Sequence, residues 1–109
     1  LKAIYYFKGF EKITTLEAPY NDLENSGEAA KFPNLKVLAL SNNPNLVSVS
    51  GIENASNLEY LDLSGTHVAD LSPLLKLKKL KWVSIDHMAD DMKEKLHSVN
   101  PTIEIVTKY

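Results

Sequence analysis

The apolar residues of this chain recur with a period of about 22 residues, which is typical of a solenoid in which similar units stack side by side. One copy of the pattern starts at Leu35 and reads L-x-x-L-x-L-x-x-N, and the next copy starts at Leu58. A further copy starts at Leu80, and an earlier one starts at Ile13. The sequence therefore predicts about four coils.

The spacing within a copy predicts the structure of each half of a coil. In L-x-x-L-x-L the last two apolar residues are two apart, so both face one side of a short strand while the residue between them faces the other. The second half has an apolar residue at every third position, as in Leu71, Leu74 and Leu77, which suits a tight 3-10 turn. We expect an α/β solenoid with a parallel, concave β-sheet and a convex side of 3-10 or short helical segments. The three-residue spacing also extends back to Leu1.

Polar residues mark the turns between these halves. Asn21 and Asn43 fall where the chain leaves a strand, and an amide there can bond to backbone groups that the ladder leaves unpaired. Thr66, at the same place one copy later, can do part of this. The pair Ser72-Pro73 predicts an N-cap and first position for a helical turn over 74–79. A similar turn is expected over 26–31.

The repeat breaks after Met88. From Asp90 onward, Met92, Leu96 and Val99 fall at helical spacing, and Asn100-Pro101 predicts the end of the helix. Ile103 and Ile105 then alternate as in a strand. We interpret residues 1–109 as a single domain, with repeats over 1–88 and a C-terminal cap of one helix and one edge strand over 89–109, because terminal units of a solenoid are atypical.

Composition narrows the class of protein. The formal net charge is −2 and no long run of like charges occurs, so neither nucleic-acid binding nor membrane binding is favoured. No apolar stretch is long enough to span a membrane. The absence of cysteine excludes disulfides and thiolate chemistry, and leaves both a secreted or cell-surface and a cytoplasmic location open. Since the chain starts at Leu1 rather than Met, we expect that a tag, a signal peptide or a larger parent has been trimmed.

The segment 51–80, GIENASNLEYLDLSGTHVADLSPLLKLKKL, resembles the leucine-rich-repeat superfamily. It is similar to the 22-residue class of bacterial internalins, whose pattern has G-I/L, N-L, L-D-L-S and D-I/L-S-P-L in this order. The repeat covers about four-fifths of the chain. The resemblance implies a curved array whose strands line the concave side and bind other proteins. The same class also occurs in intracellular regulators, and the residues after Met88 identify no internalin flanking region.

The register of the copies names the residues on the outward side of the sheet. The row that precedes the first inward strand residue contains Thr15, Val37, Tyr60 and Trp82, and large aromatic side chains on an exposed face are typical of binding hot spots. Acidic residues accompany them. We predict that an unidentified protein partner with a basic, partly apolar segment binds the residues Val37, Tyr60, Trp82, Glu17, Asp62 and Asp86. The alternative is that the aromatic residues only cover the sheet or pack under the C-terminal cap, and that the acids are solvated charges.

Nothing in the sequence indicates an enzyme. His67, His87 and His97 are not accompanied by a nucleophile motif or by metal-ligand spacing, and neither a phosphate-binding loop nor a calcium loop is present. We therefore expect no catalytic residue, no metal and no cofactor. A competing hypothesis is a structural or spacer segment of a longer leucine-rich-repeat surface or regulatory protein, with the binding residues elsewhere. The edge strands could also pair with a second copy to form a homodimer.

Overall fold

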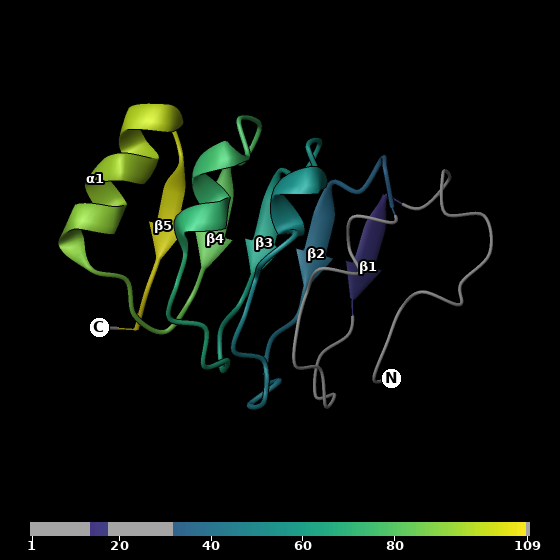
Figure 1. The fold of residues 1–109 in the computed structure, drawn as a ribbon, viewed down its shortest axis with the longest axis horizontal. Helices are drawn as coiled ribbons and strands as arrows, with labels where there is room; N and C mark the ends of the chain where they lie inside the picture. The colour runs from purple at the N-terminus through teal and green to yellow at the C-terminus, as the bar shows by residue number, and fades with distance from the viewer. Residues whose placement is uncertain (1–13, 18–31, 109) are drawn as a thin grey trace.

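The structure is a computed structural model that describes residues 14–17 and 32–108. In these residues a single parallel sheet contains five strands, in the same order as in the sequence (Figure 1). The strands are β1 (Thr15–Glu17), β2 (Val37–Ala39), β3 (Tyr60–Asp62), β4 (Trp82–Ser84) and β5 (Glu104–Val106). Sequential parallel strands require that each connection crosses the same face of the sheet, so the chain advances by one coil per strand.

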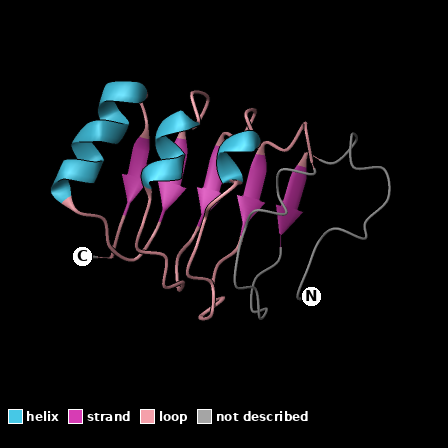
Figure 2. Ribbon diagram, viewed as in Figure 1, coloured by secondary structure: helices cyan, strands magenta, loops and turns pink. Residues whose placement is uncertain are grey.

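The connections form a second layer in front of the sheet (Figure 2). This layer contains two 3-10 helices and one α-helix, namely η3 (Ile52–Asn54), η4 (Ser72–Lys76) and α1 (Asp90–Val99). Contacts between η3 and η4, and between η4 and α1, keep the layer continuous. The predicted solenoid of parallel strands with 3-10 and short helical connections is therefore confirmed.

The inward residues of neighbouring strands lie directly beside one another. Leu16 pairs with Leu38, Leu38 with Leu61, Leu61 with Val83, and Val83 with Ile105. The three central members are at most 1% exposed. This row is the centre of a core that also contains the apolar residues at three-residue spacing on the helical side. Each coil therefore buries its apolar residues mainly against the coils next to it.

The turns that follow β2 and β3 are each held by a polar side chain, as predicted. The Asn43 amide is fully buried, and its Nδ2 donates to the carbonyl oxygens of Leu40 at 2.8 Å and Ser41 at 3.2 Å. One copy later, the Thr66 hydroxyl donates to the Leu63 carbonyl oxygen at 2.7 Å. Asn21 lies outside the described residues.

Two adjacent coils approach closely where these turns begin. Asn42 has a φ of 59° and Gly65, in the next coil, a φ of +72°. A Cβ atom on Gly65 would lie 2.6 Å from Asn42 Oδ1 and 3.1 Å from its Cα and N atoms. Only glycine combines this left-handed backbone with this contact without strain.

The prediction for the 74–79 segment was wrong in its boundaries. The helical turn is η4, which begins at Ser72 and ends at Lys76, and Leu71 rather than Ser72 is its N-cap. Asp70 provides a hydrogen-bond acceptor at the start of the helix, since its Oδ1 accepts the Ser72 backbone N–H at 3.0 Å. Hydrogen bonds from the Ser72 hydroxyl and N–H hold the pKa of Asp70 below its ordinary value. The turn expected over 26–31 and the spacing from Leu1 to Ile13 lie outside the described residues.

The C-terminal cap agrees with the sequence. Helix α1 covers Asp90–Val99 and buries Leu96 completely, and β5 pairs with β4 as the last strand of the sheet. Asn100 does more than end the helix: its buried Nδ2 donates to the Leu77 carbonyl oxygen at 2.9 Å. This bond ties the cap to the preceding coil.

Replacing Leu61 tests the inward row. Leu61→Ala should lower the free energy of unfolding by about 2–5 kcal/mol through the cavity it leaves. Leu61→Asp should abolish folding, because it places an unpaired charge between coils. Circular dichroism during urea titration measures both. The matched control is Val47→Asp, at a position that is 58% exposed, which should change stability by only about 0.5 kcal/mol. Equal effects of the two aspartates would contradict the packing described here.

Replacing Asn43 tests the buried amide. Asn43→Ala leaves the Leu40 and Ser41 carbonyl oxygens without this donor, so unfolding should become easier by about 1–3 kcal/mol. Asn54→Ala, at an exposed position in η3, is the control and should be close to neutral in the same urea titration. If both variants unfold at the same urea concentration as the unsubstituted chain, the amide does not hold the turn.

Candidate functional site

The predicted row of outward residues exists in the sheet. Thr15 pairs with Val37, Val37 with Tyr60, and Tyr60 with Trp82, and the row continues to Glu104 on β5. Tyr60 is 43% exposed, whereas Val37 and Trp82 are half-buried. The strand register therefore brings Tyr60 and Trp82 side by side on the side of the sheet away from the core.

The C-terminal cap does not lie over this row. Helices η3, η4 and α1 all lie on the opposite side of the sheet (Figure 2), and α1 contacts η4. Among the described residues, no helix thus covers the outward side of the sheet. The row is held in register by the strand pairing and lies over the close-packed core.

The predicted acidic residues sit beside this row, and one of them also supports a turn. Glu17 is exposed and pairs in register with Ala39, which pairs with Asp62. Asp62 Oδ1 accepts the Ser64 backbone N–H at 3.0 Å and the Ser64 hydroxyl at 2.7 Å. A substitution at Asp62 would therefore loosen the turn after β3 as well as remove a charge.

Asp86 has a similar double position. Its Oδ1 accepts the Gly65 backbone N–H at 3.1 Å and lies 3.6 Å from Lys108 Nζ. The first contact links the turn after β4 to the turn after β3, and the second is largely exposed to solvent. Asp86 thus connects neighbouring coils, and this role does not depend on a partner.

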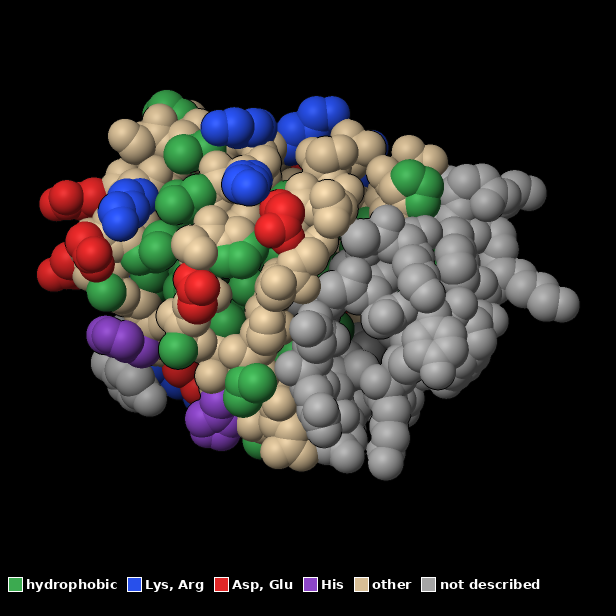
Figure 3. All heavy atoms as spheres, viewed as in Figure 1, with side chains coloured by type: hydrophobic (Ala, Val, Ile, Leu, Met, Phe, Trp, Pro, Cys, Tyr) green, Lys and Arg blue, Asp and Glu red, His purple; other side chains and the backbone are tan. Residues whose placement is uncertain are grey.

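Charge is divided between the two ends of the strands. Exposed Lys78, Lys79 and Lys81 precede β4, whereas Asp90 and Asp91 follow it. Figure 3 shows lysine side chains gathered along the upper edge of the helical side, while histidines lie along the lower edge. On the strand side, Lys81 Nζ lies 3.1 Å from Glu59 Oε1, which neutralises the acid that precedes β3. Acidic side chains therefore occur both on the outward strand positions, as at Glu17 and Glu104, and after β4, as at Asp86.

The histidines have structural contacts. His67 is exposed, and its Nδ1 faces the Pro44 carbonyl oxygen. His97 faces two carbonyl oxygens, of Lys93 through Nδ1 at 3.0 Å and of Ile103 through Nε2 at 3.2 Å. Among the described residues, no three acidic or histidine side chains are grouped to hold a metal ion, and no helix combines the length and apolar content that a membrane span needs.

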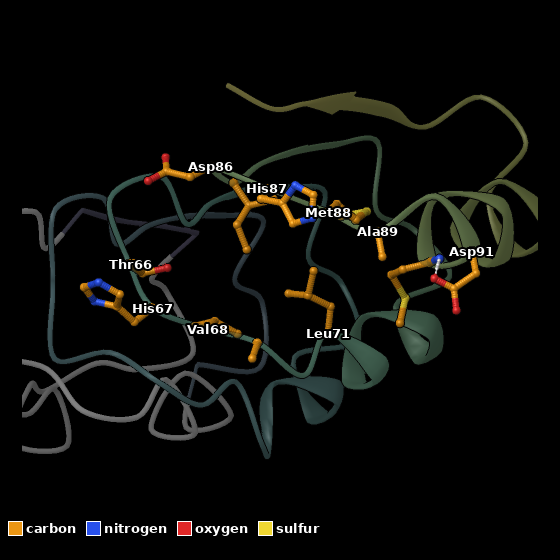
Figure 4. Close-up of a pocket in the computed structure, with 12 residues that line it drawn as sticks. Thr66, His67, Val68, Leu71, Asp86, His87, Met88, Ala89 and Asp91 are labelled. Atoms are coloured by element: carbon orange, nitrogen blue, oxygen red, sulfur yellow. Dashed lines mark hydrogen bonds between the residues drawn. The ribbon is translucent and has the colours of Figure 1, made fainter. Parts of the chain in front are cut away.

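The structure contains a hollow near the ends of β3 and β4 that the sequence analysis did not predict. It has a volume of about 480 Å³ and lies between the loop after β3 and the segment that joins β4 to α1 (Figure 4). The signal was present in the sequence, because Asp90 stands where the repeat requires an apolar residue. The hollow is lined by Thr66, His67, Val68, Ala69, Leu71, Ile85, Asp86, His87, Met88, Ala89, Asp91 and Met92.

Known proteins share this repeat and this fold. One curated relative is acidic leucine-rich nuclear phosphoprotein 32 family member A of Drosophila pseudoobscura pseudoobscura. The two are 29% identical over 83 residues, which is 70% of this chain and 32% of the relative. No protein-family model matches the chain. The chain thus spans about a third of this relative.

Solved structures give the same result for the fold. Internalin C2 of Listeria monocytogenes has a TM-score of 0.72 at 18% identity, over 89% of this chain and 42% of that one. A second Listeria internalin has a TM-score of 0.66 at 20% identity, over 84% and 26%. A chain of the Drosophila melanogaster SNF/U2A′ complex has a TM-score of 0.68 at 27% identity, over 88% and 60%. The repeat, the parallel sheet and these similarities together show that the chain has a leucine-rich-repeat fold, with a solenoid similar to those of internalins and U2A′.

Proposed function

We propose that the chain is a non-enzymatic protein-interaction module whose partner binds the concave, outward side of the sheet. The observation that supports this most is the placement of Tyr60 beside Trp82, with Tyr60 43% exposed. Aromatic side chains on a rigid platform bury much area at little entropic cost, which is why they dominate binding energies at interfaces.

The charges beside the row favour a partner segment that is basic and partly apolar. Glu17 and Glu104 are exposed on the outward side, and Asp62 and Asp86 are half-buried there. Complementary charge steers association and disfavours other partners more than it adds affinity. Val37, at the other side of Tyr60, would extend the apolar contact. That one structural neighbour was solved as part of a protein complex, SNF with U2A′, agrees with this class of function.

A second candidate is a structural segment of a longer leucine-rich-repeat surface or regulatory protein. Two observations favour it: Val37 and Trp82 are half-buried, and the carboxylates of Asp62 and Asp86 accept hydrogen bonds within the solenoid. In that case the outward residues stabilise the solenoid and do not bind a partner.

Pairing of edge strands with a second copy is a further alternative. β5 ends the sheet, and its Val106 is 39% exposed. Analytical ultracentrifugation distinguishes this alternative, because strand pairing predicts a dimer, whereas the proposed interaction module needs only the monomer.

The aromatic pair can be tested with a captured partner. A partner isolated from the native host by affinity to the chain is identified, and its dissociation constant is measured by calorimetry. Tyr60→Ala combined with Trp82→Ala should weaken binding by roughly a hundredfold or more, since each residue is expected to be a hot spot. Tyr60→Ala alone isolates the exposed member, because truncating half-buried Trp82 also costs stability.

Val47→Ala is the matched control, as it removes an exposed apolar group from a loop after β2, and it should bind as the unsubstituted chain does. If the double variant, still folded by circular dichroism, binds the partner with unchanged affinity, the proposed face is wrong and the structural alternative gains.

A further inference from the structure

The hollow after β4 is the place where the last repeat lacks an apolar side chain. In the second copy, Leu46 is fully buried, and the loop of the third copy lies against it, with the His67 N–H donating to the Leu46 carbonyl oxygen at 2.9 Å. Val68 occupies the same slot in the third copy. Its counterpart one repeat later is Asp90, which is exposed and starts α1. The fourth copy therefore has no apolar side chain at this position to cover Val68 in the way that the loop of the third copy covers Leu46.

The burial of the neighbouring residues shows the result. Val68 remains half-buried, although it packs against the core. The next apolar position of the repeat shows the same change to a charged residue, since Leu71 corresponds to Lys93 one repeat later. An α-helix is also wider than the 3-10 turns of the other coils, so α1 stands off from this loop. The hollow is thus an unfilled position of the repeat, and Figure 4 shows Val68, Leu71, Met88 and Ala89 around it.

The lining suits an apolar side chain of variable shape. Leu71, Ile85 and Met88 are almost completely buried and form apolar walls, and Met92 is half-buried beside them. Met88 and Met92 are the two methionines of the chain. Unbranched thioether side chains adapt to different occupants at low cost, which is why they recur in adaptable binding surfaces. A volume of about 480 Å³ is within the range of ligand pockets.

The charged groups at the mouth are acidic. Asp86 and Asp91 line the hollow, and none of the lining residues is lysine or arginine. Asp90 follows Ala89 at its edge and is exposed. Lys108 lies 3.6 Å from Asp86, but its side chain is 66% exposed, so this pair is weak and leaves the mouth negative. A cationic group beside an apolar one is the complementary chemistry.

We infer that this hollow is a peptide-binding site that takes a leucine-sized apolar side chain flanked by lysine or arginine. The peptide supplies the apolar group that the fourth copy omits, and its basic residues face Asp86, Asp91 and Asp90. The site does not depend on the aromatic row, since its residues come from the loop after β3, the segment that joins β4 to α1 and the start of α1. Asp86 is shared by both surfaces, so a single partner can contact the two.

Nuclear magnetic resonance of the methionine methyl groups gives a direct test, because both signals arise from residues of the hollow. The chain carrying ¹³C-methyl methionine is titrated with three tripeptides, each acetylated and amidated: Lys-Leu-Lys, Glu-Leu-Glu and Lys-Ser-Lys. We expect Lys-Leu-Lys to shift both signals saturably in the millimolar range, and the other two to bind roughly tenfold more weakly or less, since one lacks the charge and the other the apolar group. No shift with Lys-Leu-Lys, or equal shifts with all three, would overturn the site.

A substitution that fills the hollow tests whether the peptide binds there. Ala89 is exposed at the mouth, so Ala89→Leu should fold normally and weaken Lys-Leu-Lys by roughly tenfold through occupation of the space. Thr102→Leu adds a similar side chain at an exposed turn before β5 and should leave binding unchanged. Unchanged binding by a folded Ala89→Leu chain would refute the inference. Tyr60→Ala should retain tripeptide binding, which separates this site from the aromatic row.

Discussion

The packing of Leu38 and Leu61 between adjacent parallel strands is the contact on which the rest of the structure depends. Each lies at most 1% exposed between the coils on its two sides. A single coil cannot bury these side chains alone, so folding requires the stack. Since a one-residue shift would turn every inward residue outward, the same contact fixes which residues face the solvent. The position of Tyr60 next to Trp82 is therefore a consequence of the core.

Much of the fold follows from the period of the sequence. The strand register, the buried Asn43 and the limits of α1 could be predicted, because each depends on local spacing and on a neighbour one repeat away. The start of η4 could not. There the Asp70 carboxylate accepts the Ser72 N–H and Leu71 is the N-cap, whereas the spacing of the apolar residues is the same whether the helix begins at Ser72 or at Leu74.

The candidate site was predictable in its position but not in its energetics. The repeat placed Val37, Tyr60 and Trp82 in one row, yet burial of Trp82 depends on its neighbours in three dimensions. Likewise, the hydrogen bonds that engage Asp62 and Asp86 come from turns whose shape the period does not specify. The hollow beside α1 followed from one exception to the pattern, Asp90, whose effect is visible only when the widths of an α-helix and a 3-10 turn are compared.

Native-state hydrogen exchange tests most directly whether the coils support one another. The backbone N–H groups of Leu40, Leu63 and Ile85 each donate to the next strand, at 2.9, 2.7 and 3.0 Å. If the coils are stable only as a stack, these three amides should exchange with free energies that agree within about 1 kcal/mol and equal that of global unfolding. If one coil opens with a free energy several kcal/mol below the others while they stay protected, the inward leucines do not make the solenoid one cooperative unit.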